Sequence, residues 1–254
     1  MKRTIHKNYP FILLAVFLCV WIWGAINPVS PEAWMLENIL VVIAVPTIII
    51  LGKYFRFSNI SYTCIVAFMI LHMIGAHYTY AEAPLGSGIG EWFGSNRNIY
   101  DRIVHFSFGF LWVYPVREVL LRVAKIRGFW SYVVPLEMAF SFSAIFEIFE
   151  WFIVVASNEE TGVAFLATQG DIWDAQKDMA LAALGAFVTL SSIAVVNWFH
   201  SREFRKEMRD SFTIGERQNP VGEISMKDVM EEKKKLLRKA QKIKKRYQKT
   251  QKKK

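Results

Sequence analysis

Six runs of apolar residues, each about 20 residues long or longer, fill most of the first 199 positions of the chain. They cover residues 9–27, 34–52, 57–78, 100–122, 130–156 and 172–199. An α-helix that crosses a bilayer needs about 20 consecutive, mostly apolar residues. Hydrophobic residues form 53% of the chain and the mean hydropathy is +0.23, both high for a water-soluble protein. The sequence predicts an all-α, polytopic membrane protein with six transmembrane helices in residues 1–199.

Lys and Arg are concentrated in alternate connections between these runs. The basic segments are residues 1–8, 53–56 and 117–127, and the tail from residue 200. The intervening connections, at 28–33, 79–99 and 157–170, hold a single basic residue, Arg97. Because cytoplasmic loops carry the excess of Lys and Arg, we expect both termini to be cytoplasmic.

The net charge of +9 comes from the tail, where 19 Lys and Arg accompany 8 Asp and Glu from His200 onward. Basic segments on the cytoplasmic side attract anionic lipids by about 1 kcal/mol per basic residue near the surface. We expect residues 200–254 to form a partly helical or disordered cytoplasmic unit that lies on anionic lipids; a solvated tail without a specific partner is the alternative. Aromatic residues are not interleaved with the basic ones, which argues against nucleic acid as a partner.

Acidic residues and histidines gather near the predicted outer ends of the later runs. Three pairs, each separated by three or four positions and therefore on one helical face, are Asp101 with His105, Glu147 with Glu150, and Asp174 with Asp178. Charge inside a membrane helix is costly unless it is paired, hydrated or bound to a metal. The predicted topology brings these pairs to a similar depth, about one helical turn inside the outer boundary.

Several further polar residues accompany the pairs. His72 and His77 are five positions apart, so their directions differ by about 140° on a helix and both cannot easily face one ligand; we favour His77. Arg102 and Lys177 are candidate counter-ions or anion-binding groups. Asp171 is expected to cap the sixth helix, and we expect Glu37, a lone acid in the second run, to face the outer interface.

Oxygen and imidazole donors without cysteine suit Zn, Mn, Fe or Mg. The candidate metal ligands are Asp101, His105, Glu147, Glu150, Asp174, Asp178 and His77. Glu150, Asp178 and Arg102 are the candidate catalytic residues. Structural hydrogen bonds and ion pairs remain the alternative for each pair.

Four segments resemble the YjdF-type family of bacterial inner membrane proteins, a family described as a domain of unknown function. They read NIYDRIVHFSFGFL from residue 98, YPVRE from 114, SAIFEIFEWF from 143 and ATQGDIWDAQKDMALAALGA from 167. The resemblance covers roughly residues 60–195 and implies an inner-membrane location, but it brings no established reaction.

A fainter pattern is similar to the VanZ-type membrane proteins, which are associated with glycopeptide tolerance at the cell envelope. It consists of Asp101, Arg102, His105 and Phe106, then Glu147 and Glu150, then Asp174 or Asp178 with Gly185.

The leading functional hypothesis is a metal site at the outer face of the membrane, where a metal-activated water attacks a phosphate or ester of a lipid or envelope precursor. A proton-coupled transporter is the second hypothesis, because buried acids and histidines also form proton relays. The third is a non-catalytic membrane scaffold whose acidic cluster forms a buried ion-pair network.

Overall fold

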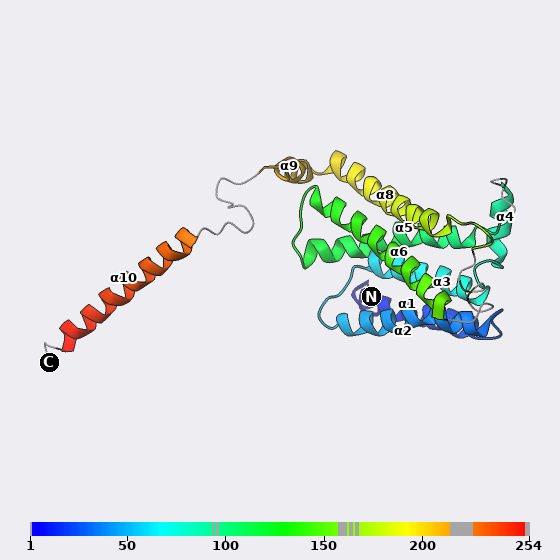
Figure 1. Cartoon of the computed structure of the whole chain (residues 1–254), viewed down its shortest axis with the longest axis horizontal. Helices are drawn as coiled ribbons and strands as arrows, with labels where there is room; N and C mark the ends of the chain where they lie inside the picture. Colours follow the sequence, from blue (N-terminus) through cyan, green and yellow to red (C-terminus); the bar gives the residue numbers. More distant parts are fainter. Residues whose placement is uncertain are drawn as a thin grey trace. The chain divides into compact units, whose positions relative to one another are not determined.

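The computed structural model describes residues 2–92, 94, 97–156, 162, 165, 168–213 and 226–251, and every regular element in these residues is an α-helix (Figure 1). The helices are α1 (Lys2–Gly24), α2 (Pro31–Leu51), α3 (Asn59–His77), α4 (Pro84–Trp92), α5 (Tyr100–Arg122), α6 (Trp130–Ala156), α8 (Asp174–His200), α9 (Arg202–Asp210) and α10 (Met226–Gln251). The all-α prediction is therefore confirmed for the part of the chain that the structure describes.

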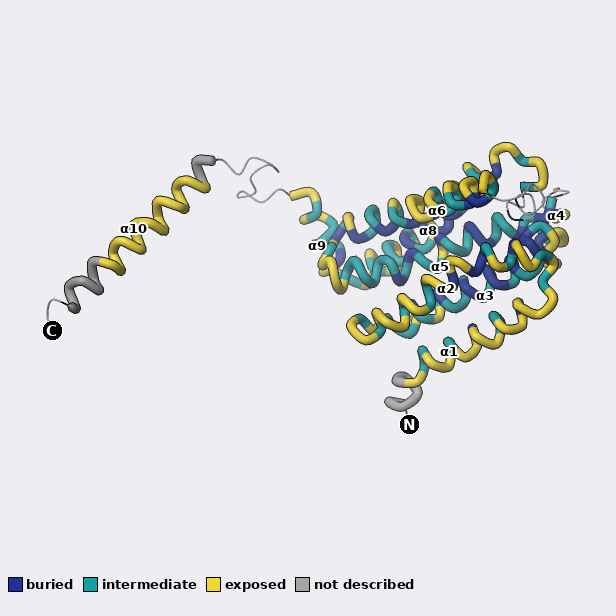
Figure 2. Tube along the Cα trace, turned by 60° about the horizontal axis from the view of Figure 1, so that its bottom comes forward, coloured by how far each residue is buried: buried dark blue, intermediate teal, exposed yellow. Residues whose placement is uncertain are grey.

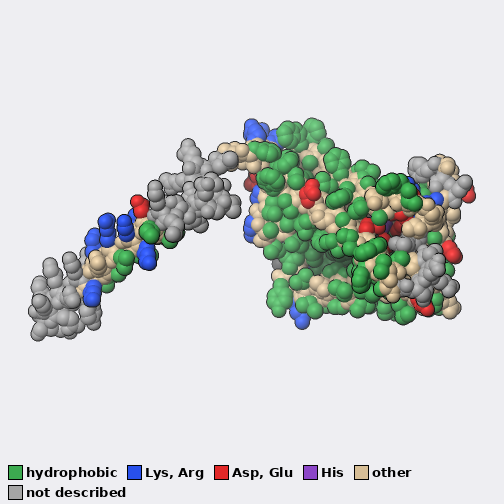
Figure 3. Space-filling model, in the orientation of Figure 1, with side chains coloured by type: hydrophobic (Ala, Val, Ile, Leu, Met, Phe, Trp, Pro, Cys, Tyr) green, Lys and Arg blue, Asp and Glu red, His purple; other side chains and the backbone are tan. Residues whose placement is uncertain are grey.

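Four of these helices, α2, α3, α6 and α8, are long and apolar enough to cross a membrane. In α1, only the shorter segment Asn8–Gly24 is apolar. α5 has 23 residues but carries charged side chains at both ends, which lowers its mean hydropathy. Large apolar side chains cover the outside of the bundle, as the space-filling view shows (Figure 3), and such a surface is expected where lipid replaces water.

α5 lies at the centre of the bundle and packs against α3, α6 and α8. α1 and α2 pack on α3, whereas α6 packs on α5 and α8. In the described residues, no Cα atom of α6 lies within 8 Å of a Cα atom of α2 or α3. Buried residues follow the inward faces of these helices, and the faces turned outward are exposed (Figure 2).

Two glycines allow α5 and α8 to approach closely. A Cβ atom on Gly109 would lie 1.7 Å from the carbonyl oxygen of Ala182, and one on Gly185 would lie 2.1 Å from that of Phe106. Small residues at a helix crossing bring the two backbones together in membrane bundles. This contact fixes the separation of the two helices that carry Asp101, His105 and Asp178.

The chain divides into two compact units, Met1–Ser211 and Phe212–Lys254. The first unit includes α9, beyond residue 199. Its Phe204 is 8% exposed and packs on Tyr132 and Trp198, and Ser211 accepts a hydrogen bond from the Phe129 amide (2.9 Å). In the second unit, the described side chains of α10 are exposed.

Candidate metal centre

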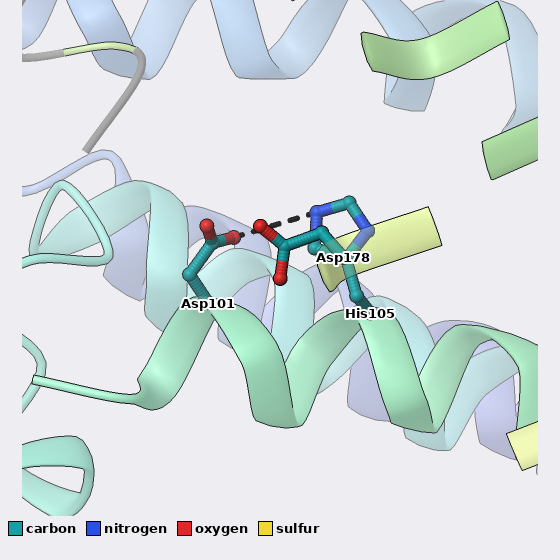
Figure 4. A group of neighbouring side chains, drawn as sticks. All are labelled: Asp101, His105 and Asp178. Atoms are coloured by element: carbon teal, nitrogen blue, oxygen red, sulfur yellow. Dashed lines mark ion pairs between the residues drawn. The ribbon is translucent and has the colours of Figure 1, made fainter. Parts of the chain in front are cut away.

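Asp101, His105 and Asp178 form a compact group at the junction of α5 and α8. One ligand atom from each of the three lies within 4.8 Å of the other two. Asp101 and His105 share a face of α5, and the Oδ1 atom of Asp101 is 3.5 Å from the Nε2 atom of His105. Figure 4 shows the two carboxylates and the imidazole turned toward one another. The spacing on α5 and the close approach of α8 together create the group.

α6 adds two carboxyl groups beside these three residues. The Oε1 atom of Glu147 is 3.7 Å from the Nε2 atom of His105, and Glu150 follows Glu147 by three positions on the same helix. The structure thus brings four of the predicted ligands together: Asp101, His105, Glu147 and Asp178. We call Asp101, His105, Glu147 and Asp178 the metal group.

Two oxygen atoms of the metal group are buried without a hydrogen-bond donor in the described structure. They are Oδ1 of Asp178, a residue only 2% exposed, and Oε1 of Glu147. A buried acceptor without a partner costs about 1–3 kcal/mol, and more if it is charged. A bound cation would supply the missing interaction to both oxygens.

Asp174 and Arg102, two other predicted site residues, belong to a neighbouring cluster of ion pairs. The Oδ1 atom of Asp174 is 2.5 Å from the Nη2 atom of Arg97. Arg102 pairs with Asp171, whose Oδ2 atom is also 2.6 Å from the Nζ atom of Lys177. We call these five residues the rim. Asp174 and Arg102 are engaged there, so we assign them to the rim rather than to the metal group.

Asp171 is the carboxylate of the rim that both Arg102 and Lys177 contact. Hydrogen bonds from the Lys177 ammonium, the Trp173 amide and the Arg102 guanidinium lower the pKa of its carboxyl from the usual 3.8 to about 2. The Trp173 amide donates to Oδ1 over 3.1 Å, at the start of α8 where a negative charge is favourable. The carboxylate therefore stays ionised far below neutral pH.

The loops before α5 and α8 are joined by hydrogen bonds. The Asn98 amide donates to Oε1 of Gln169, and Nε2 of Gln169 donates to the Asn98 carbonyl, both over 2.9 Å. Arg97 also donates to the Thr168 carbonyl (2.5 Å). Sequence reasoning gave Arg97 no role in the site, although its position as the single basic residue in the predicted outer connections was a usable signal.

The two histidines of α3 make contacts in different parts of the bundle. His72 is buried, and its Nδ1 atom is 2.5 Å from the hydroxyl oxygen of Tyr80. His77 instead faces away from the metal group, where its Nδ1 atom is 3.1 Å from the Gly24 carbonyl oxygen and its ring packs on Trp23. The structure therefore does not bring His77, the favoured histidine, to the predicted site.

Glu37 lies beside His72, with its Oε2 atom 3.9 Å from Nε2 of the imidazole. The expectation that Glu37 faces the outer interface is wrong, since the residue is only 4% exposed. Burial, followed by the negative charges of Glu37 and Asp101, raises the pKa of Tyr80 well above its usual value. Nε2 of His72 donates to the Glu37 carbonyl oxygen (3.3 Å), so Nδ1 accepts from the Tyr80 hydroxyl. Sequence reasoning missed this contact because Tyr80 lies beyond the helix.

A cavity of about 610 Å³ adjoins the metal group and is lined by residues of α2, α3, α5 and α6. Most of its wall is aliphatic or aromatic. The ionisable side chains on its wall are those of His72, Tyr80, Asp101, His105 and Glu150. The cavity thus connects the acidic and histidine residues to a long apolar space.

Comparison with known proteins gives two matches. Residues 9–199 match a family described as "Predicted membrane protein (DUF2238)". The chain is also similar to the inner membrane protein YjdF of Escherichia coli (strain K12), at 34% identity over 208 residues, which are 81% of this chain and 97% of the relative. No solved structure matches the chain. The family match includes every residue of the metal group and the rim, and it leaves α10 outside.

Proposed function

The chain belongs to the DUF2238 family of predicted membrane proteins, and we propose that this integral inner membrane protein binds a divalent metal ion at the outer end of its helix bundle. The observation that carries the proposal is the pair of buried oxygens without donors, Oδ1 of Asp178 and Oε1 of Glu147, beside Asp101 and His105. Three carboxylates and one imidazole suit Zn, Mn, Fe or Mg.

The proposed topology has six membrane spans with both termini in the cytoplasm. Four helices support it by their length and apolar composition. α5 supports it by its position, because α3, α6 and α8 pack around it and shield its polar residues from lipid. The apolar segment of α1 packs on α3, and the alternation of basic connections supplies the orientation. The metal group then lies near the outer face.

The proposed chemistry is hydrolysis of a phosphate or ester in a lipid or envelope precursor. A bound divalent ion would supply a water of lowered pKa and polarise the substrate oxygen. Glu150 is the general acid–base candidate, because it is a buried carboxyl group on the wall of the cavity beside the metal group. Asp178 would hold the ion, and Arg102 would contribute from the rim, where it pairs with Asp171 and Asp174.

The test is metal analysis of the detergent-purified full-length protein by inductively coupled plasma mass spectrometry. We expect stoichiometric metal in the wild type and at least about tenfold less in Asp178→Asn and Glu147→Gln. Glu137→Gln is the matched control, since Glu137 is an exposed residue of the same helix as Glu147 and should retain the metal.

Full metal content in both variants would reject the proposal. So would a metal-free wild type after growth with added Zn, Mn, Fe and Mg. Loss of metal in Glu137→Gln as well would show that any acid on α6 matters, which would also contradict a specific group.

A proton-coupled transporter is the second candidate, favoured by the titratable residues that share one cavity wall. Tyr80, His72 and Glu37 form a continuous series of contacts beside it, and buried acids and histidines act as proton relays in membranes. Proton uptake into proteoliposomes that fails in Tyr80→Phe would support this function. If the wild type takes up no protons, the transporter is rejected. The metal site, or a scaffold stabilised by the ion pairs of the rim, then remains as the function.

We also propose that α10 lies on anionic lipid headgroups. Its described residues combine exposed lysines with the exposed apolar side chains of Val229, Leu236 and Ile243, which recur every seven residues on one side of the helix. Binding of a 212–254 peptide to vesicles containing phosphatidylglycerol, weakened by salt and absent with phosphatidylcholine, is the expected result. Equal binding to both vesicles would contradict it.

A further inference from the structure

The apolar cavity of about 610 Å³ beside the metal group extends along most of the length of α5. Asp101 and His105 line both the metal group and the cavity. On α5, the cavity wall continues from Asp101 as far as Leu120. At a rise of about 1.5 Å per residue, this interval is about 28 Å long, which is close to the roughly 30 Å thickness of a bilayer's hydrocarbon core.

The wall of this long space is suited to hydrocarbon. Phe108, Trp112 and Val116 line it on α5, and Phe142 and Phe146 line it on α6. Polar ligand groups are concentrated among the wall residues near the start of α5 and the end of α6, at Asp101, His105 and Glu150. A ligand that fills it needs a polar head at one end and a long apolar remainder.

The cavity lies between α2 and α6. α2 and α6 both contribute to its wall, yet in the described residues no Cα atom of one lies within 8 Å of a Cα atom of the other. Ile43 of α2 and Ile145 of α6 line the cavity and are also 61% and 60% exposed. They therefore form an apolar edge that faces the surroundings of the bundle, and Figure 3 shows a hollow in the hydrophobic surface.

From these observations we infer that the cavity receives the hydrocarbon chain of a phosphorylated membrane lipid, which enters sideways from the bilayer between α2 and α6. The lipid phosphate then lies against the metal group. This inference rests on the proposed metal function for the head of the lipid, whereas the site of the chain depends on the cavity alone.

The test is photo-crosslinking of the full-length protein, reconstituted in vesicles, with phosphatidic acid that carries a diazirine in its acyl chain. Mass spectrometry should find cross-links on the cavity wall of α5, around Phe108 and Trp112. Ala44→Trp, which adds bulk to a half-buried residue of the cavity wall, should reduce this labelling at least fivefold. Val42→Trp is the matched control, because Val42 is 62% exposed on the same helix, and its labelling should equal the wild type.

Cross-links confined to the outer surface of the bundle would overturn the inference, and so would α5 labelling that Ala44→Trp leaves unchanged. The wild-type map decides the matter even if Ala44→Trp fails to fold. Metal content measured on the same samples separates the two proposals: a metal-bound protein without labelling on α5 rejects the lipid chain alone, and a metal-free protein with such labelling rejects only the metal.

Discussion

Two aspartates near the start of α8 show how the surroundings of a carboxylate decide its role. Asp171 accepts hydrogen bonds from Lys177 and Arg102, so its charge is fully compensated. Asp178 is buried, and its Oδ1 atom has no donor in the described structure. The hydrogen bonds of Asp171 stabilise the fold, whereas the oxygen of Asp178 without a donor is available to bind a ligand. Substitution of Asp171 should therefore change the stability of the protein, whereas substitution of Asp178 should change its metal content.

Asp171→Asn should destabilise the protein at neutral pH and make little difference in acid. The folded protein has a pKa of about 2 for this carboxyl, below the usual 3.8. Its contribution to stability is therefore complete above about pH 4 and is lost as the pH falls through about 2. Thermal unfolding of both proteins in detergent, followed from pH 7 to pH 2, should show two melting temperatures that converge.

A difference in melting temperature that stays constant over this pH range would contradict the assigned ion pairs. Asp210→Asn, at an exposed position of α9, is the control and should follow the wild type at every pH.

At the scale of single residues, helical spacing predicted which side chains share one face of a helix. It did not predict which side chains of other segments they contact. Helical spacing brought Asp101 and His105 to one face, and the structure adds Glu147 and Asp178 to them. Spacing could not decide between His72 and His77, because both positions are compatible with an α-helix until the neighbours of α3 are known. The partner of His72, Tyr80, lies outside any periodic segment.

At the scale of helices, the α5–α8 contact determines the geometry of the metal group. Both glycines of this contact face the backbone of the opposite helix, so neither neighbour can move aside as a flexible side chain would. The helices also carry three of the four residues of the metal group. Any increase in their separation would act on stability and on metal binding together.

Gly109→Ala and Gly185→Ala should each destabilise the bundle by about 1–3 kcal/mol, the usual cost of overpacking, or more because backbone atoms clash. Each should also lower the metal content. Gly88→Ala in α4 is the matched control, because a Cβ atom there would meet nothing within 4 Å. Unfolding midpoints of the three purified variants check the prediction, and equal midpoints for Gly88→Ala and Gly109→Ala would contradict it.

Long helices were predictable from the sequence, and short ones were not. The predicted runs 100–122 and 130–156 coincide with α5 and α6. α2 begins at Pro31, ahead of the predicted residue 34, because Ser30 caps it and proline suits the first helical turn. α4 and α9 have nine residues each, too few to show an apolar run, and α9 is held by tertiary contacts of Phe204.

At the scale of the whole molecule, the proposed topology can be tested by cysteine labelling. In a chain without Cys19 and Cys64, Glu82→Cys should react with a membrane-impermeant maleimide in intact spheroplasts. Tyr54→Cys, 86% exposed between α2 and α3, should react only after the membrane is opened. The reason is that Glu82 follows α3 on the expected outer side, whereas Tyr54 adjoins the basic residues Lys53 and Arg56. Reaction of Tyr54→Cys in intact spheroplasts would contradict the topology.

The central position of α5 has a consequence for the biogenesis of the protein. A ribosome makes α5 before α6 and α8, although these helices cover it and α8 supplies Asp178 to its Asp101 and His105. Until residue 200 has been synthesised, the polar side chains of α5 lack their last neighbour. The order of assembly therefore differs from the order of translation. α5 can reach its final environment only when α8, the last helix of the bundle, has been made. Until then, α5, which is less apolar than the other long helices of the bundle, lies in an incomplete bundle.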